Sequence, residues 1–456
     1  MNETNLMSKM KISKAVATMA IPSVISSLVT VVYNMADTFF VGQTGDPLQV
    51  AAVSLTNPIF ILFMAFANMF GMGGSATASI AMGEKNEKRM KNVSAFITYA
   101  SLITGIFFAV ILLLGAKPIL QIFGADKQTY DLAYGYLFHI SYGAPFVIWS
   151  AAASFVVRAE GASKEAMIGS MIGTIVNIIL DPIMIFGLLG CPKMGVTGAA
   201  AATVIGQCVA AIVAFTCNHK FNHDVKLHFR GFRPSAKIIG TIYAIGVPSI
   251  IMQSIGSVMT YSMNRILIEF SSTATAVFGV YFKLQSFFFM PLFGLNNGIT
   301  PIIAYNYGAR NRKRMVKTIR LSLITAFCLT FIGFLCFEGI PQILLGMFNA
   351  SEDMLTIGIP ALRIIGIHYL LAWFCIVSGT VFQALGKAVF SMIVSIMRQL
   401  VVLIPAAYIL SKLGGLHVVW WSFPIAEIVS LVVSLLFLLR INRTVISKIP
   451  DGSDIL

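Results

Sequence analysis

The chain contains very little charge. Only 11% of its 456 residues are charged, whereas 57% are hydrophobic, and a soluble domain carries about 25% charged residues. This balance excludes a soluble globular protein and predicts an all-α integral membrane protein with several spans. The net charge of +14 does not indicate nucleic-acid binding, because the basic residues lie in short segments between apolar runs, where membrane topology explains them.

Cysteine is scarce, and the motifs of common catalytic centres are absent. The six cysteines have no paired spacing and fall mostly within or at the ends of apolar runs, so we expect neither a disulfide framework nor a metal centre. The sequence contains no HExxH, GxSxG or P-loop motif, which argues against a membrane-embedded enzyme. Because it also contains no nucleotide-binding domain, ATP-driven transport by this chain alone is excluded. No cofactor is expected.

Long apolar runs dominate what is present. A helix needs about 20 apolar residues to cross a bilayer. The first run contains Pro22 and Asp37 and has a counterpart deep in the chain, so we interpret it as a retained span rather than a signal peptide. The runs predict twelve transmembrane helices, at approximately residues 15–41, 51–80, 93–114, 130–157, 165–188, 195–217, 237–268, 275–305, 318–338, 355–382, 388–411 and 417–440.

The segments between the runs alternate in charge. Most of the 32 Lys and Arg lie at the N-terminus, in every second connecting segment, and in the C-terminal tail. The positive-inside rule therefore predicts that both termini are cytoplasmic, and the even number of helices agrees. The expected location is a cytoplasmic membrane of the bacterial type.

The chain contains an internal repeat. The stretch Gly83–Lys91 returns as Gly308–Met315 at a constant offset of 225, and Ile21–Ser23 returns near the same offset as Val247–Ser249. Since both basic loops face the same side, each repeat contains an even number of spans. The two halves are therefore expected to be parallel six-helix lobes related by an axis along the membrane normal. The predicted domains are residues 1–219, a cytoplasmic connector at 220–236, and residues 237–456.

The first run ends in an acidic segment. Asp37 lies five residues before the Gly42–Gly45 turn, which places it roughly 7 Å inside one face of the membrane. Tyr33 and Asn34 precede it by four and three positions and so share its helix face. An acid at such a depth costs about 3 kcal/mol. Either Asp37 reaches the interface and is solvated there, or it is functional.

A second acid occurs at a similar depth. Asn177 and Asp181 are four residues apart on one run and share a face. Asp181 lies roughly 10 Å from the external end of its run, and Thr203 and Tyr136 reach a similar depth from the same side. Two facing carboxylates in a medium of low dielectric cannot both ionise easily. Such a layer suits a reversible proton site or a Na⁺ site made of Asp37, Asn177, Asp181 and Thr203; otherwise Asp181 has only a packing role.

The second half contains its own charged residues within apolar runs. Intramembrane charges tend to face a bundle interior and to pair, so these residues could form a charge network that rearranges during transport. Alternatively, some of them extend to the interface. A basic cavity would favour an anionic substrate. The residues are Lys283, Arg363, Arg398 and Glu427.

These features together resemble the multidrug and toxic compound extrusion (MATE) family. The resemblance covers essentially residues 10–440. The motifs that carry it are loose singly, but their order and the repeat make the whole specific. They are Pro22, Tyr33–Gly42, Asn177-x-x-x-Asp181-Pro182, Gly195–Ala200, Lys283-Leu284-Gln285, Pro291-x-x-Gly294 and Tyr305–Ala309.

The resemblance implies a secondary antiporter that exports mainly cationic, amphipathic organic compounds in exchange for H⁺ or Na⁺ by alternating access between two lobes. The acid site of one branch of the family maps onto Asp37, Asn177, Asp181 and Thr203, and Tyr136 aligns less securely. Another branch uses acids on the seventh and tenth helices, where this chain offers no mid-helix acid, so that site is not transferred. We expect a monomer in a lipid bilayer, with the coupling ion undecided.

Two related readings remain open. A flippase for lipid-linked saccharides, or another exporter of anionic substrates in the same superfamily, would have a strongly basic central cavity and often additional helices. A major-facilitator transporter also has twelve helices in two parallel halves, but Gly83–Lys91 lacks the pattern of acid and arginine that is usual in that family.

Overall fold

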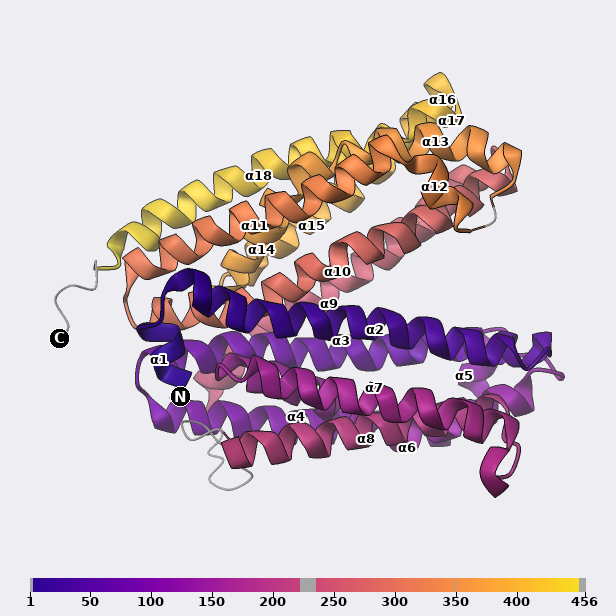
Figure 1. Ribbon diagram of the computed structural model, residues 1–456, viewed down its shortest axis with the longest axis horizontal. Coiled ribbons are helices and arrows are strands. Elements are labelled where there is room, and N and C mark those ends of the chain that lie inside the picture. Colours follow the sequence, from indigo (N-terminus) through magenta and orange to yellow (C-terminus); the bar gives the residue numbers. More distant parts are fainter. Residues whose placement is uncertain (1–2, 222–234, 349, 451–456) are drawn as a thin grey trace.

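The computed structural model describes the backbone of residues 3–221, 235–348 and 350–450, and over these ranges it contains helices and no strand. The long helices form two lobes (Figure 1). The N-terminal lobe contains α2 (Ile12–Gly42), α3 (Pro47–Gly83), α4 (Glu87–Leu114), α6 (Tyr130–Ala159), α7 (Ser163–Phe186) and α8 (Val196–Phe221), with the short α1 (Glu3–Ser8), α5 (Ala116–Ile122) and η1 (Leu188–Gly190).

The C-terminal lobe repeats this arrangement with more interruptions. Its long helices are α9 (Ala236–Ile268), α10 (Ser272–Gly308), α11 (Arg312–Gly339), α13 (Glu352–Gly366) with α14 (Tyr369–Ala384), α15 (Ala388–Ile396) with η2 (Met397–Leu403) and α16 (Ile404–Gly414), and α18 (Ser422–Thr444). Short helices are α12 (Pro341–Gly346), α17 (Leu416–Val419) and η3 (Ile446–Lys448).

The number of spans agrees with the prediction. Within the described ranges, 11 helices are long and apolar enough to cross a membrane, and α13 with α14 makes a twelfth if this pair is one span. The all-α fold with two six-helix lobes is therefore confirmed. The predicted connector, residues 220–236, lies almost wholly outside the described residues, and the domain boundaries on either side of it stay predictions.

The sequence repeat is also a structural repeat. Lys85 and Arg310 both adopt left-handed backbone conformations, with φ of 55° and 54°, which non-glycine residues adopt only in special turns. In each lobe an Asn follows, and its side chain accepts a hydrogen bond from a backbone N–H three residues later: 3.0 Å for Asn86 and 3.1 Å for Asn311. Such a bond satisfies a free donor at the start of a helix, so both lobes begin the helix after this turn in the same way.

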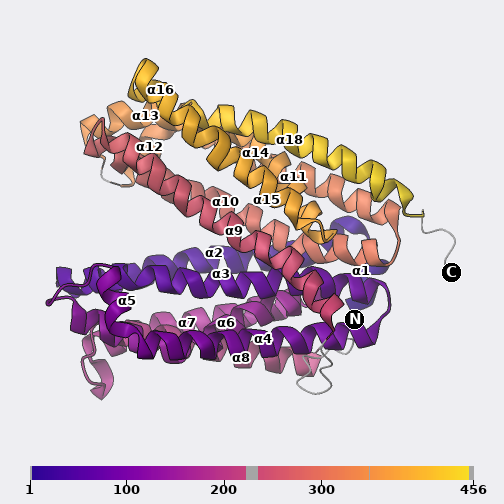
Figure 2. The same ribbon diagram turned by 180° about the vertical axis from the view of Figure 1, so that it is seen from behind.

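The two lobes converge at one end of the molecule and diverge toward the other (Figures 1 and 2). We call the end that carries α1 and the end of α18 the terminal end, and the opposite one the far end. At the terminal end, α3 and α10 meet through two glycines. A Cβ on Gly83 would overlap the carbonyl oxygen of Tyr305, and a Cβ on Gly308 would overlap that of Ile80. These two contacts are equivalent by the offset of 225, so the lobes meet here as a twofold pair.

A second pair of crossings between the lobes is not symmetric. On one side, Gly298 of α10 abuts Ala20 of α2. On the other side, Gly73 of α3, which is the repeat equivalent of Gly298, abuts Ile242 of α9. The equivalent of Ala20, aligned by the shared proline, is Gly246, four residues further along α9. The two crossings therefore differ by about one helical turn.

Two of the predicted C-terminal helices are interrupted. The run predicted at 355–382 bends by 50° between α13 and α14. Here the carbonyl oxygen of Ile365 is bonded by the backbone N–H of His368 at 3.0 Å and also contacts Nδ1 of the His368 ring. These bonds replace the i→i+4 pattern at this carbonyl, which explains the break. In the next run, η2 is a π-helical segment, a feature that is often found at functional sites.

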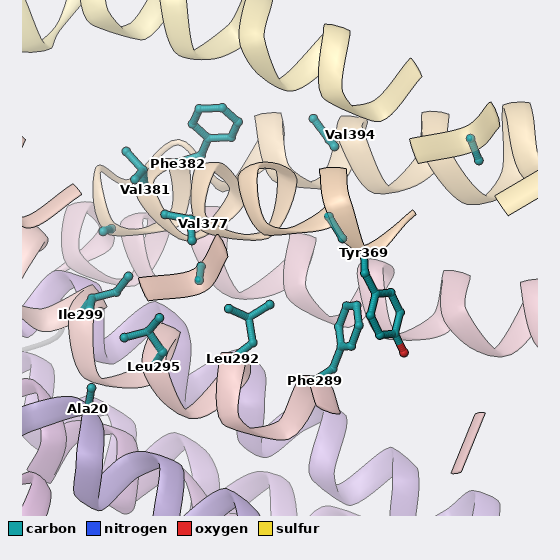
Figure 3. Close-up of a cluster of buried hydrophobic side chains, with 14 of the residues drawn as sticks. Ala20, Phe289, Leu292, Leu295, Ile299, Tyr369, Val377, Val381, Phe382 and Val394 are labelled. Carbon is teal, nitrogen blue, oxygen red and sulfur yellow. The ribbon is translucent and has the colours of Figure 1, made fainter. Parts of the chain in front are cut away.

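Each lobe has its own apolar core, and the core of the C-terminal lobe extends onto α2. Figure 3 shows part of it, with Ala20 of α2 facing α10 near Leu295 and Ile299. Phe289 packs edge-on against Tyr369, with ring centroids 4.9 Å apart. The small side chain of Ala20 and Gly298 together allow α2 and α10 to approach closely.

Candidate functional site in the N-terminal lobe

The structure brings the two predicted acids of the N-terminal lobe together. Asp37 lies on α2 and Asp181 on α7, and these helices pack against each other. Asp181 is completely buried, Asp37 is half-buried, and the two carboxyl groups are close enough to interact electrostatically. Among the described residues, no salt bridge joins either acid to a basic side chain.

A polar cluster connects α2, α7 and α8 beside the acids. The Nδ2 group of Asn177 lies 3.4 Å from Oδ1 of Asp181 and 3.5 Å from Oγ1 of Thr203. The hydroxyl groups of Tyr33 and Thr203 lie 3.3 Å apart. Oδ1 of Asn177 and Oδ2 of Asp181 are buried without a hydrogen-bond partner among the described residues. Buried polar atoms rarely stay unpaired, so these two oxygens are available to a proton or a cation.

The remaining predicted members of the layer differ in how closely they take part. Tyr136 on α6 is buried and interacts electrostatically with Asp37, Tyr33 and Asp181, but no hydrogen bond joins it to them among the described atoms. Asn34 lies within α2, but its side chain lies outside the described residues. The depths predicted from the sequence thus indicated one layer, whose residues come from α2, α6, α7 and α8.

The cluster borders a cavity of about 290 Å³. Tyr33, Asn177 and Thr203 form part of its wall, and the aromatic or thioether side chains of Phe60, Met64 and Phe155 also line it. Such side chains suit apolar and cationic ligands of varied shape.

Arg158 is a wall residue that lies directly after the run predicted at residues 130–157. It lies in the last turn of α6, its guanidinium carbon is 5.1 Å from the centre of the Phe155 ring, and it lines the cavity. Its Nε is buried without a partner among the described atoms. A basic residue at the end of an apolar run usually indicates an interface, so only its position three residues after a phenylalanine could have signalled this role.

Two of the four charged residues predicted for a network in the C-terminal lobe are paired. Nη1 of Arg398 on η2 lies 3.6 Å from Oε2 of Glu427 on α18, and the exposed fractions of the two side chains are 27% and 4%. The pair joins two helices, as one of the two predicted alternatives requires.

The other two residues lie outside this pair, as the alternative of side chains that extend to the interface allows. Lys283 is exposed, with its Nζ 5.8 Å from the centre of the Phe348 ring. Arg363 is also exposed, and its Nε donates to the carbonyl oxygen of Glu338 at 3.3 Å. Both long side chains reach the surface of the lobe, since a charged head is more stable there than in an apolar interior.

The donors of the N-terminal cluster decide what it can bind. No group of three or more His, Cys, Asp or Glu side chains capable of holding a metal occurs within the described ranges. The cluster instead offers carboxylate, amide and hydroxyl oxygens, which are the ligands of hard cations. A carboxylate pair of this kind can hold a proton equally well.

The comparison with known protein families agrees with this architecture. The MatE family profile matches twice, over residues 22–183 and 248–409, once in each lobe. The chain belongs to the MatE family. This family consists of multidrug efflux transporters, which agrees with the resemblance found in the sequence. The two matches also follow the internal repeat of the sequence.

Curated MATE relatives cover the whole chain. The chain is 30% identical over 447 residues to the multidrug export protein MepA of Staphylococcus aureus strain MSSA476, covering 97% of this chain and 98% of the relative. It is 31% identical over 444 residues to MepA of Staphylococcus haemolyticus, covering 96% of each chain.

Solved MATE structures share the fold. One is described as the outward-facing conformation of a multidrug resistance MATE family transporter of the MOP superfamily; it has a TM-score of 0.90 and 26% identity, and covers 98% of this chain and 99% of the other. A MOP superfamily transporter from Pyrococcus furiosus, described as having a binding pocket of reverse polarity, has a TM-score of 0.88 and 27% identity, with coverage of 98% and 99%.

Proposed function

We propose that this MATE transporter is a secondary antiporter that exports amphipathic organic cations in exchange for H⁺ or Na⁺, with Asp37 and Asp181 as the coupling acids. The observation that carries the proposal is the pair of acids, Asp181 completely buried and Asp37 half-buried, neither of which is joined to a basic side chain in the described part of the chain. An intramembrane acid without a counter-ion is costly and is therefore a functional feature by default.

The coupling follows from charge balance within the cluster. Two neighbouring carboxylates in an apolar lobe repel one another, so uptake of a proton or Na⁺ relieves the repulsion. In the Na⁺ case, Oδ2 of Asp181 and Oδ1 of Asn177 supply unpaired oxygens, and Oγ1 of Thr203 lies beside them. The ion drives transport only if it binds one arrangement of the lobes more tightly than the other. The described structure, with lobes diverging at the far end, is one of these arrangements.

In this proposal, the organic cation binds in the cavity beside the cluster. Phe60 and Phe155 present aromatic faces to it, and Met64 adds a flexible apolar side chain. Aromatic faces attract desolvated cations, and methionine adapts to ligands of different shapes. A cationic cargo close to Asp37 and Asp181 would compete with the coupling ion for the same negative charge, so the two bind in turn.

The experiment measures release of a fluorescent lipophilic cation from proteoliposomes under an imposed pH gradient and, separately, a Na⁺ gradient. Wild type, Asp37→Asn and Asp181→Asn are compared, with Asp131→Asn as the matched control because Asp131 is an exposed acid of the same lobe. We expect one gradient to drive release in wild type and the control but not in the two site variants. Gradient-driven release that survives in Asp37→Asn, or its absence in folded wild type, refutes the proposal.

One observation favours a second candidate, export of an anionic or lipid-linked substrate. Arg398 presents a guanidinium group to the interior of the C-terminal lobe. The group is paired with Glu427, so the lobe is not strongly basic. Uptake of a lipid-linked oligosaccharide by the same proteoliposomes, with no movement of the cationic dye, would favour this candidate.

A further inference from the structure

The first turns of α11, at the terminal end, carry basic side chains without partners. Lys313, Lys317 and Arg320 are exposed. Within the described part of the chain, no ion pair, side-chain hydrogen bond or ring contact involves any of the three. Arg314 differs from them, because its guanidinium group donates to two backbone carbonyl oxygens of α1 at 2.6 and 3.1 Å. Arg314 therefore belongs to the fold, whereas the other three are available to an external ligand.

The three basic residues continue a stripe of exposed apolar residues along α11. Residues spaced three or four apart share one face of a helix, and Lys313, Lys317 and Arg320 have this spacing. The next four positions of the same face are apolar, with exposed fractions between 37% and 54%. On a membrane-spanning helix, such a face lies against lipid tails. These apolar residues are Ile324, Phe327, Phe331 and Leu335.

The depth of the stripe matches the layers of a bilayer. The helix continues from Arg320 to Gly339, which is roughly 28 Å at 1.5 Å per residue and close to the hydrocarbon thickness of about 30 Å. The rise from Lys313 to Arg320 is roughly 10 Å, enough to cross a headgroup layer of about 5–8 Å. The basic side chains therefore lie at the depth of the phospholipid phosphates, in the leaflet that the positive-inside rule assigns to the cytoplasm.

The repeat shows that the fold does not require this stripe. By the offset of 225, Lys317 and Arg320 correspond to Asn92 and Ala95 of α4. Ala95 is completely buried, whereas Arg320 is exposed. The same helix of the scaffold therefore forms without basic residues at these two positions, and the basic stripe is a feature of the C-terminal lobe.

The balance of charge at the terminal end also differs between the lobes. In the N-terminal lobe, Nη1 of Arg89 lies 2.7 Å from Oε2 of Glu84, and Nζ of Lys91 lies 3.9 Å from Oε2 of Glu87. The corresponding part of the C-terminal lobe, residues 306–337, contains no acid. The counter-charge for the stripe of α11 is therefore expected from outside this segment.

We propose that the start of α11 binds the headgroups of anionic phospholipids in the leaflet at the terminal end. The phosphate lies between Lys317 and Arg320, whose planar guanidinium fork matches two phosphate oxygens, and the acyl chains follow the apolar part of the stripe. Basic segments next to a membrane span attract anionic lipids in this way. A soluble anion would contact the basic part only, whereas a lipid covers both. The inference goes beyond the antiport proposal and does not depend on it.

The experiment titrates the purified full-length chain in a neutral detergent with phosphatidylglycerol or with phosphatidylcholine of the same acyl chains, and native mass spectrometry measures the bound lipid. We expect wild type to bind phosphatidylglycerol about tenfold more tightly, the effect of one to two basic residues beside an anionic headgroup. The triple variant Lys313→Gln/Lys317→Gln/Arg320→Gln removes this preference. Arg320→Gln alone lowers it to about threefold, which gives a second measurement if the triple variant fails to fold.

A matched control tests whether the position of the charges matters. Lys88→Gln/Lys91→Gln/Lys164→Gln removes the same charge from exposed residues of the N-terminal lobe and retains the preference. No preference in wild type, a preference that survives in the α11 triple variant, or an equal loss in the control overturns the inference. Displacement of the lipid by an equal concentration of glycerol 3-phosphate, which has the phosphate but no acyl chains, also overturns it in favour of a site for soluble phosphates. Because no ion gradient is applied, failure of the antiport proposal leaves these outcomes unchanged.

Discussion

The two lobes place charged residues at different positions along equivalent helices. Asp181 lies toward the far end of α7, and the equivalent position in the C-terminal lobe is Ala406. Arg398 instead lies eight residues before that position, at the equivalent of Gly173. At about 1.5 Å per residue, the two charged positions are roughly 12 Å apart along the helix axis. The two halves of the repeat thus share the positions of their helices but not the positions of their charged residues.

Helix packing at this position also differs between the two lobes. In the N-terminal lobe, a Cβ on Gly173 would lie 2.6 Å from the carbonyl oxygen of Gly206 and from Cβ of Ala210, so α7 and α8 are in close contact. In the C-terminal lobe, Arg398 occupies this position, the helix is π-helical there, and a cavity of about 720 Å³ borders it. Gly173 also borders a cavity, the one of about 290 Å³, so the two lobes differ at this position in the size of the cavity and in the charge of its wall.

The largest expected effect comes from filling the close helix contact of the N-terminal lobe at Gly173. Gly173→Val forces a side chain into the contact between α7 and α8, which costs about 1–3 kcal/mol or more. We expect a lower midpoint of thermal unfolding in detergent. Gly279→Val is the control, because no atom lies within 4 Å of a Cβ built there. Equal midpoints for the two variants would show that the close packing is unimportant.

A smaller effect is expected from breaking the charged pair of the C-terminal lobe. Glu427→Gln leaves the guanidinium group of Arg398 without its counter-ion, which we expect to lower the free energy of unfolding by about 2 kcal/mol, less than for a fully buried pair because Arg398 is 27% exposed. Replacing both residues with apolar ones of similar size, Arg398→Met with Glu427→Leu, should restore most of this loss. Denaturation of the single and double variants followed by circular dichroism tests the expectation; a double variant less stable than the single one contradicts it.

The next expected effect concerns the polar cluster of the N-terminal lobe, where the positions equivalent to Asn177 and Asp181 in the C-terminal lobe are Val402 and Ala406. Asn177→Leu removes the amide between Asp181 and Thr203, and we expect gradient-driven dye release to slow by about tenfold, the effect of losing hydrogen bonds to a charged group. The equivalent residue of the C-terminal lobe is Val402, and Val402→Ala should leave the rate nearly unchanged. Similar rates in the two variants would remove the distinction between the lobes.

The smallest expected effect comes from the edge of the cluster. Tyr33→Phe deletes the hydroxyl group that lies 3.3 Å from Oγ1 of Thr203. A neutral hydrogen bond contributes about 1 kcal/mol, so we expect the initial rate of release to fall by about fivefold, with the ion specificity unchanged. A change of coupling ion in this variant would mean that Tyr33 touches the ion.

The sequence was sufficient for the scaffold and for the acid layer, because both depend on counting along helices. Apolar runs and the offset of 225 predicted the lobes, and depth along each run brought Asp37 near Asp181. Counting could not separate Lys283, which reaches the surface, from Arg398, which faces a cavity, since both lie within apolar runs. It also missed the break at His368, where a side chain contacts a backbone carbonyl, because such a contact leaves no periodic pattern.

The displaced crossings between the lobes have a consequence for how the molecule can move. In the structure Gly73 of α3 lies against Ile242 of α9, and Met69 lies against Gly246 one turn further along. A shift of one turn would bring Gly73 to Gly246 and would match the crossing of α2 and α10. Helices that slide past one another by a whole turn change position in discrete steps. The contact of Gly83 and Gly308 is already symmetric, so no shift is needed to make the two lobes equivalent there. We therefore expect the lobes to switch between discrete positions in which α3 and α9 are shifted by one helical turn, while the contact at the terminal end stays in place.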